Sequence, residues 1–214
     1  MKRHLIFLLV LCGLFQAAQA QSNTLYQNDF EKAEIGKVPD DFLVLDGRFA
    51  VRQADANKFL ELPGSPIDGY SVQFGPADRG GLSVFARIRG TSTGRRYPTF
   101  GVGLNGVAGH RLQVNPARKL IELFKDQEIK ATAPFDWKPG QWTGLRLRSR
   151  ESKSGGWIIE ARVWTQSDPE PNTWMVSVAE PEQPNSGRAS VFGSPFSGTP
   201  IQFDDLTVQK VSPD

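Results

Sequence analysis

Two adjacent stretches with a strict period-two alternation constrain the fold of this chain more than any other feature. Between Gln141 and Gln166, apolar residues fall on odd positions and charged residues on even positions, on both sides of a Ser/Gly-rich segment at 152–156. An alternation of period two puts one set of side chains on each face of a β-strand. We therefore predict two antiparallel strands with one buried and one solvent-facing side. The buried side consists of Leu145, Leu147, Ile159, Ala161 and Val163, and the solvent-facing side consists of Arg146, Arg148, Arg150, Glu160 and Arg162.

The turn between these strands sets the residues that face each other. With a turn over 152–156, paired positions sum to 308, which places Arg148 opposite Glu160 and Trp164 over Gly144. Both pairs are favourable neighbours across two strands.

The same register brings Arg146 beside Arg162. Two adjacent guanidinium groups repel each other unless a carboxylate such as Glu160, or an anionic ligand, lies between them. The charged face is therefore a candidate ligand surface, and a solvated face without a ligand is the alternative.

The first twenty residues have the pattern of a secretory signal peptide. Lys2 and Arg3 precede an apolar run at 5–15, and Ala18-Gln19-Ala20 supplies the small residues that a signal peptidase requires. We expect cleavage before Gln21, a secreted or periplasmic protein, and a single domain over 21–214. The apolar run is shorter than the roughly 20 residues that span a bilayer, and no later stretch comes close, so no membrane span is predicted. The one cysteine, Cys12, lies in this segment, so the exported part is stabilised by its core and not by disulfides.

The charge balance argues against a nucleic-acid partner. Two of the 25 basic residues lie in the signal, which leaves 23 basic residues against 23 acidic ones. No basic run is longer than Arg95-Arg96, whereas binding to phosphates calls for a basic patch. The exported part has a single histidine, His110, which excludes zinc sites with several His or Cys ligands and leaves one candidate base for a Ser-His-Asp triad.

The remaining chain consists of short apolar runs separated by Gly, Pro, Asn and Asp, with no helical stripe. About fourteen such runs without internal repeats predict an all-β fold, namely two antiparallel sheets packed as a jelly-roll sandwich. We expect a hairpin around 54–57 and a meander over 99–133. The loop at 90–98 contains Arg96 and Tyr97, and loops on a rigid scaffold often bind ligands, although a plain surface loop is the alternative.

The last run, at 201–211, contains a change of parity. Its inward positions are odd up to Phe203 and even from Leu206, so the strand must bulge or twist at Asp204-Asp205.

Several segments carry a family resemblance. They are LYQNDFEKAEIGKVPDDF, GHRLQVNPARKLIELFKD with WKPGQWTGLRLRSR, WIIEARVWTQSDPEPNTW, and GRASVFGSPFSGTPIQFDDLTVQKV, and they span nearly all of the exported part. Together they resemble the concanavalin A-like lectin/glucanase superfamily, in particular exported bacterial LamG-like domains grouped with glycoside hydrolase family 16. The resemblance implies a curved jelly roll whose concave sheet can receive a saccharide.

The catalytic motifs of that superfamily are missing. Active family 16 members carry E-x-D-x-x-E, because retaining hydrolysis needs two carboxyl groups about 5 to 5.5 Å apart. The sequence has no E-x-D, and its nearest matches, Asp126-Gln127-Glu128 and Asp168-Pro169-Glu170, fall at predicted turns. Alginate-lyase relatives carry Q-I-H and Y-F-K-x-G strands, but Gln113-Val114-Asn115 lacks the histidine and the second motif is absent.

Three functions stay open at this point. The first is a non-catalytic carbohydrate-binding domain, in which Trp164 stacks on a sugar and arginines bind hydroxyls or carboxylates. The second is a glycan-degrading enzyme that uses Glu160 with Glu122. The third is a structural or adhesion domain of the cell envelope without a small ligand. The candidate ligand-binding residues are Arg146, Arg148, Glu160, Arg162, Trp164, Arg96 and Tyr97.

The resemblance also implies a structural calcium ion, because that fold commonly pairs its terminal strands and often holds Ca²⁺ near them. The candidate ligands are Asp29, Asp204 and Asp205, with Asn28 and Glu31 nearby. Calcium binds six to eight oxygens, which carboxylates, an amide, carbonyls and water can supply. The alternative is that one aspartate faces solvent and the other binds backbone amides freed by the bulge.

Overall fold

The structure is a computed structural model that describes residues 23–65, 68–196 and 198–213. The predicted signal peptide at 1–20 lies outside the described residues. Within these ranges, none of the chain forms a helix with the length and apolar character of a membrane span. The helical content of the described chain is a 3-10 turn at Pro116–Arg118.

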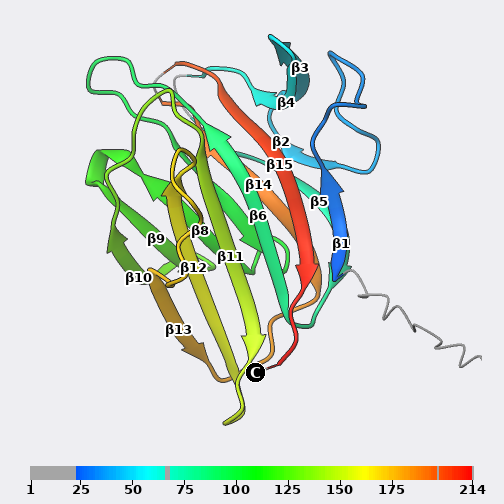
Figure 1. The fold of residues 1–214 in the computed structure, drawn as a ribbon, viewed down its shortest axis with the longest axis vertical. Helices are drawn as coiled ribbons and strands as arrows, with labels where there is room; N and C mark the ends of the chain where they lie inside the picture. The colour runs from blue at the N-terminus through cyan, green and yellow to red at the C-terminus, as the bar shows by residue number, and fades with distance from the viewer. Residues whose placement is uncertain (1–22, 66–67, 197, 214) are drawn as a thin grey trace, which may run out of the picture.

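In the described residues, fifteen strands form two antiparallel sheets that pack face to face (Figure 1). The eight-stranded sheet contains, in spatial order, β13 (Val176–Glu180), β12 (Trp157–Thr165), β11 (Thr143–Glu151), β6 (Leu82–Arg89), β15 (Ile201–Lys210), β4 (Asn57–Leu62) and β3 (Ala50–Ala54), with β1 (Thr24–Asn28) paired to β15. The seven-stranded sheet contains β10 (Glu128–Pro134), β9 (Leu120–Lys125), β8 (His110–Asn115), β7 (Thr99–Leu104), β14 (Gly187–Ser194), β5 (Tyr70–Asp78) and β2 (Leu43–Asp46). The predicted all-β sandwich is confirmed.

The core lies between the sheets and is built from the alternate residues of each strand. The predicted apolar face of β11 and β12 is buried there, and it packs with inward residues of the seven-stranded sheet such as Val102, Leu112 and Ile121. Each fully buried aliphatic side chain contributes about 1.5–3 kcal/mol relative to leaving it in water. Burial of the apolar residues therefore fixes which face of each strand is turned inward, and the charged residues at the alternate positions point outward.

The predicted register of the central hairpin is confirmed. Arg148 pairs with Glu160, and Gly144 pairs with Trp164. The indole ring of Trp164 packs directly on the backbone of Gly144. A Cβ at position 144 would come within 2.5 Å of this ring, so only glycine leaves room for it. A larger residue at position 144 would displace this ring.

The predicted irregularities are also present. The pairing of β15 with β6 shifts between Asp204 and Thr207, and Asp205 adopts a positive φ of 51° at that point. The hairpin of β3 and β4 turns at Asp55, which has a φ of 54°. Strands β7 to β10 form the predicted meander. The fault in β15 is thus a bulge, and it turns Asp204 toward neighbouring side chains.

Candidate functional site

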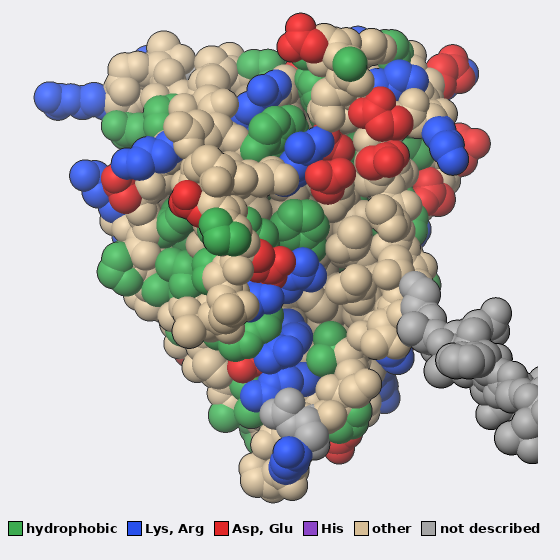
Figure 2. Space-filling view, viewed as in Figure 1, with side chains coloured by type: hydrophobic (Ala, Val, Ile, Leu, Met, Phe, Trp, Pro, Cys, Tyr) green, Lys and Arg blue, Asp and Glu red, His purple; other side chains and the backbone are tan. Residues whose placement is uncertain are grey.

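The outer face of the eight-stranded sheet carries the arginines that the sequence singled out. Figure 2 shows basic side chains gathered along the middle of this face. Arg146 and Arg148 on β11 and Arg162 on β12 share it, since they alternate with inward residues of the core. We refer to Arg146, Arg148, Arg150 and Arg162 as the arginine face.

The repulsion between Arg146 and Arg162 is relieved by Glu170, not by Glu160. Glu170 lies in the loop at 166–175, and its Oε1 accepts hydrogen bonds from Nε of Arg146 at 2.5 Å and from Nε of Arg162 at 2.7 Å. Nη2 of Arg146 donates to Oε2 at 3.0 Å. Burial alone would raise the pKa of Glu170, but the hydrogen bonds and charges of the two arginines outweigh it and lower the pKa. The sequence predicted a turn at Asp168-Pro169-Glu170, and Glu170 does lie in a loop, but its carboxylate is bound to the arginines and is only partly exposed.

Glu160 is an ion-pair partner. Its Oε2 accepts from Nε and Nη2 of Arg148 at 2.9 and 2.6 Å, and from Nε of Arg150 at 3.0 Å. Glu122, its suggested catalytic partner, lies on the outer face of the other sheet, where it binds Gln113. The two carboxylates point away from opposite sides of the core, so they do not form a catalytic pair.

Trp164 shares the arginine face but is not available to a ligand. It is 7 % exposed and lies between Gly144 and the ring of Phe85, which stacks on it at 5.7 Å. Stacking on a sugar needs an exposed ring face. The prediction that Trp164 contacts a ligand on an accessible surface was wrong in this respect, because the missing side chain of Gly144 lets the indole sink onto the sheet.

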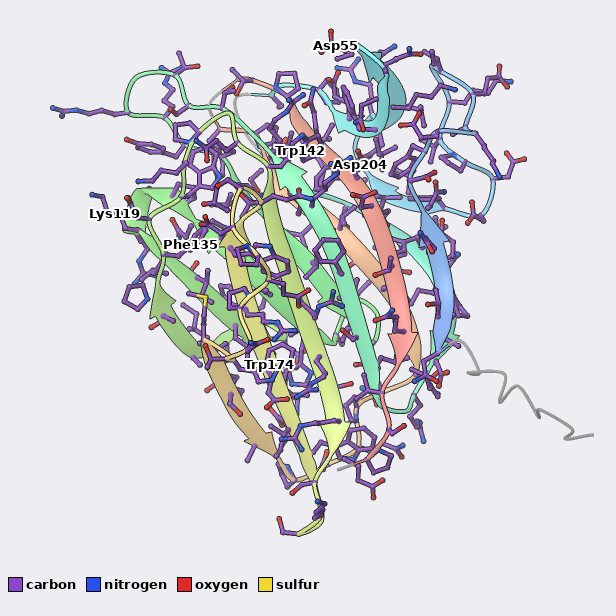
Figure 3. All side chains as sticks on the ribbon, in the orientation of Figure 1. Asp55, Lys119, Phe135, Trp142, Trp174 and Asp204 are labelled. Atoms are coloured by element: carbon purple, nitrogen blue, oxygen red, sulfur yellow. The ribbon has the colours of Figure 1, made fainter. Side chains whose placement is uncertain are left out.

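Trp174 is a half-buried aromatic residue that lies over the arginines of this face (Figure 3). Its ring centre lies 4.3 Å from the guanidinium carbon of Arg148 and 4.2 Å from that of Arg162. Together with Glu170, it brings the loop at 166–175 down onto the sheet. A shallow pocket of about 260 Å³ remains beside it, lined by Ser83, Arg146, Arg148, Arg162, Glu170, Trp174, Gln209 and Val211.

The outer face of the seven-stranded sheet carries a second depression, of about 210 Å³, which we call the hollow. Two of the three outward positions of β7 are Gly101 and Gly103, and their neighbours lean across the bare backbone. A Cβ at Gly101 would come within 2.5 Å of the ring of Phe192, and one at Gly103 within 2.5 Å of Oγ of Ser190. The hollow is lined by Leu45, Gly69, Tyr70, Ser71, Gln73, Gly106, Val107, Arg111, Gln113, Gln127, Ser190, Phe192 and Ser194.

The hollow combines the ring of Phe192 with amide and hydroxyl groups. Phe192 is half-buried, Tyr70 packs against the core, and Gln113 is held by a hydrogen bond from its Nε2 to Glu122 at 2.9 Å. The guanidinium of Arg111 lies 5.6 Å from the ring centre of Phe192, and its Nε is buried without a hydrogen-bond partner in the part of the chain that the structure describes. Burial lowers the pKa of Arg111.

No carboxylate or histidine is among the described residues that line the hollow. General acid–base chemistry needs such a group within hydrogen-bond reach of the substrate. The arrangement therefore supplies apolar ring surface and hydrogen bonds, which are the means of binding a neutral, hydroxyl-rich molecule.

The loop at 90–98 is separate from both depressions. Arg96 is exposed and forms a backbone bridge with Thr93, and Tyr97 packs against the core. Neither residue is among those that line the hollow or the pocket of the arginine face.

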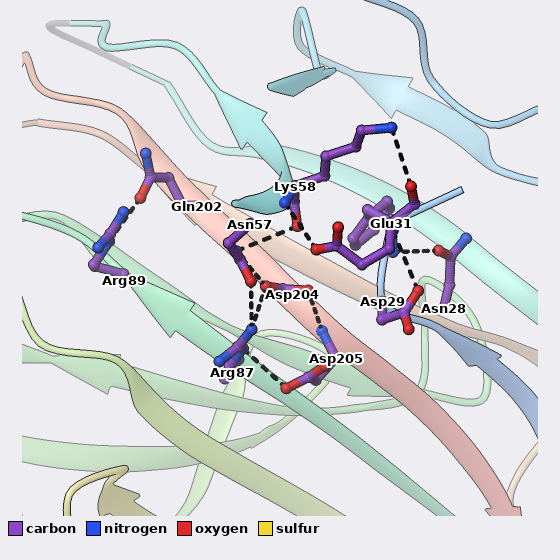
Figure 4. Close-up of polar contacts among 11 residues, drawn as sticks. Asn28, Asp29, Glu31, Asn57, Lys58, Arg87, Arg89, Gln202, Asp204 and Asp205 are labelled. Carbon is purple, nitrogen blue, oxygen red and sulfur yellow. Dashed lines mark hydrogen bonds and ion pairs between the residues drawn. The ribbon is translucent and has the colours of Figure 1, made fainter. Parts of the chain in front are cut away.

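The aspartates predicted to bind calcium are engaged with Arg87 (Figure 4). Asp204 is fully buried, and its Oδ2 accepts from Nη2 of Arg87 at 2.6 Å and from Nδ2 of Asn57 at 2.9 Å. Oδ1 of Asp204 accepts from the amide of Asp205 at 2.7 Å, and Oδ2 of Asp205 lies 2.9 Å from Nε of Arg87. Asp29 is exposed and accepts a hydrogen bond from the amide of Glu31.

The terminal strands do pair, with Asn28 opposite Leu206. Across the described ranges, no group of three or more His, Cys, Asp or Glu side chains is placed to hold a metal ion. The guanidinium of Arg87 lies between the two adjacent aspartates, so calcium would have to share their oxygens with it. The calcium site stays a prediction.

Comparison with known proteins gives the class of fold. No family model matches the sequence, and no curated protein matches it significantly. Among solved structures, the carbohydrate-binding module CBM66 from Bacillus subtilis aligns with a TM-score of 0.58 at 8% identity, over 79% of this chain and 96% of that one. The Emp47p carbohydrate recognition domain aligns with a TM-score of 0.60 at 9% identity, over 90% and 97%. The exoplasmic/lumenal domain of VIP36 in its Ca²⁺-bound form aligns with a TM-score of 0.59 at 10% identity, over 90% and 91%.

These similarities define the fold as a galectin-like and concanavalin A-like sandwich, which is also that of lectin domains and carbohydrate-binding modules. At such low identity they show the fold alone, and function has to be argued from the site.

Proposed function

We propose that this protein is an exported, non-catalytic carbohydrate-binding domain that binds a saccharide in the hollow of the seven-stranded sheet. The observation that carries the proposal is the composition of the hollow, where the half-buried ring of Phe192 lies among amide and hydroxyl groups and no carboxylate is present among the described lining residues. Aromatic rings pack on the apolar faces of sugars, and amides and hydroxyls pair with their hydroxyl groups.

The hollow is positioned by three strands of the seven-stranded sheet. It lies on β5, β14 and β8, and the two outward glycines of β7 leave room for Phe192 and Ser190 to lean across the sheet. Arg111 adds a guanidinium whose buried Nε lacks a partner in the described part of the chain. The guanidinium of Arg111 can donate hydrogen bonds to the hydroxyl oxygens of a sugar.

A glycan screen tests this function. Purified residues 21–214 are applied to an array of neutral and acidic glycans, and the dissociation constants of hits are measured by calorimetry. Phe192→Ala and Gln113→Leu are expected to weaken binding at least tenfold, which corresponds to about 1.4 kcal/mol. Trp174→Ala, on the opposite face, serves as the matched control and leaves binding of a neutral glycan unchanged.

The same screen separates the alternatives. Release of reducing sugar from a bound glycan would indicate hydrolysis and would overturn a purely binding function. Failure to bind any glycan would leave the structural or adhesion role in its place. Export is tested separately by N-terminal sequencing of the secreted protein, which is expected to begin at Gln21.

A further inference from the structure

The pocket of the arginine face is lined by more positive than negative charge. Among the described residues that line it, Arg146, Arg148 and Arg162 outnumber one carboxylate, Glu170. The four arginine side chains of this face are only 12–26% exposed. Partly buried charges are screened less by salt than fully exposed ones, so this surplus attracts an anion more strongly than a loose surface charge does.

The face already binds a carboxylate that comes from a loop outside the sheet. Glu170 reaches Arg146 and Arg162 from a loop, and Arg146 grips it with two parallel hydrogen bonds. The planar fork of a guanidinium matches a carboxylate in this way and adds geometric specificity. Glu170 thus marks the kind of group that the arginines accept.

Donors remain beside Glu170 in the pocket of about 260 Å³. Arg148 uses Nε and Nη2 on Glu160, and its Nη1 has no hydrogen-bond partner among the described residues. Nη1 of Arg146 makes only a 3.5 Å contact with Oγ of Ser83. The indole of Trp174 and the side chain of Gln209 complete the lining. Two guanidinium groups with unused donors therefore line one open pocket next to an aromatic ring.

We propose that this pocket is a second binding site, for the carboxylate groups of a polyuronate, that is, an acidic polysaccharide. A uronate residue supplies both a planar carboxylate for Arg146 and Arg148 and an apolar ring face for Trp174. The shallow, open pocket admits a residue within a long chain. The site lies on the opposite face from the hollow and does not depend on it.

The test measures binding of polygalacturonate by calorimetry, with a neutral polysaccharide and polyglutamate as comparison ligands. The wild type is expected to bind polygalacturonate more than tenfold tighter than either. Arg148→Gln is expected to weaken binding at least tenfold, whereas Arg96→Gln, which removes the same charge from an exposed loop, leaves it within twofold. Equal effects of the two variants would show non-specific charge attraction and overturn the proposal, and so would equal binding of polyglutamate.

A second variant covers the case in which Arg148→Gln does not fold. Glu170→Gln removes the internal carboxylate and is expected to tighten polygalacturonate binding at least threefold, because the ligand no longer competes with it. Unchanged or weaker binding overturns the proposal. Phe192→Ala, in the hollow, is expected to keep polygalacturonate binding intact. Loss of binding in that variant would place the ligand in the hollow and refute the second site without refuting the proposed function.

Discussion

Arg148 of β11 lies directly opposite Glu160 of β12, and both its Nε and its Nη2 donate to the same carboxylate oxygen. Arg150, two residues along the strand, donates to that oxygen as well. The carboxylate is 7 % exposed, so one buried anion holds two arginines on the outer face of the sheet.

Glu160→Gln is therefore expected to destabilise the fold. The substitution keeps the shape of the side chain but removes the charge that compensates two partly buried guanidinium groups. We expect the free energy of unfolding to fall by about 2–3 kcal/mol, as for other partly buried ion pairs that lose one partner. Urea denaturation measures it. Glu151→Gln, at the exposed end of the neighbouring strand β11, is the control, and an equal effect of both variants would contradict the role of Glu160.

Gly144→Ala is expected to destabilise the protein through Trp164. The added methyl group would come within 2.5 Å of the indole, which is held from the other side by Phe85. Overpacking of this kind costs about 1–3 kcal/mol. Thermal melts followed by tryptophan fluorescence measure it. In a Trp164→Leu background the same substitution is expected to cost much less, and an unchanged cost would mean that the clash is elsewhere.

Stability is expected to fall with acidification below about pH 6.5 because of His110. Burial lowers the pKa of His110 from 6.5, and the positive charge of Lys125 lowers it further. The negative charges of Glu180 and Asp126 act in the opposite direction and offset part of the decrease. A base with a lowered pKa in the folded state is protonated more readily when unfolded, so its contribution is complete above pH 6.5 and is lost as pH decreases.

Melting temperatures from pH 8 to pH 5 test this dependence. The wild type is expected to lose stability over that range, and His110→Gln is expected to lose less. Glu170 and Glu180 have lowered pKa values, so their contribution is present above about pH 4.5 and is lost below it in both proteins. Identical profiles of the two proteins down to pH 5 would contradict the role of His110.

Calcium is expected to raise the melting temperature if the site at Asp29, Asp204 and Asp205 forms. A ligand that binds only the folded state adds about 2.7 kcal/mol at a hundredfold excess over its dissociation constant. Melts in EGTA and in millimolar Ca²⁺ measure this, with Asp205→Asn expected to lose the response. A melting temperature that is indifferent to calcium in both proteins would remove the metal site and leave Arg87 as the partner of both aspartates.

The sequence predicted local geometry well, because the direction in which each side chain of a strand points depends on the alternation of neighbouring residues. The alternation at 141–166 gave the register of β11 and β12, and the parity change at Asp204-Asp205 gave the bulge in β15. Neither pattern predicts the order in which the strands lie in a sheet. That β15 lies between β6 and β4, and β14 between β7 and β5, depends on packing between segments far apart in the chain.

The candidate sites were harder to predict for the same reason. Glu170 and Trp174 lie in a loop without periodicity, so no pattern indicated that they fold back onto the arginines. The hollow did leave a signal, since Gly101 and Gly103 alternate with Phe100 and Val102 and so leave one face of β7 bare. Which side chains lean across that face became apparent only from the structure.

The most direct test of glycan binding in the hollow is an amide chemical-shift titration with the neutral glycan that binds most tightly in the screen. The account predicts that the shifted amides cluster at 71–73, 111–113 and 190–194, where β5, β8 and β14 line the hollow. Shifts confined to β11 and β12 of the opposite sheet, or no shifts with any neutral glycan, would contradict it.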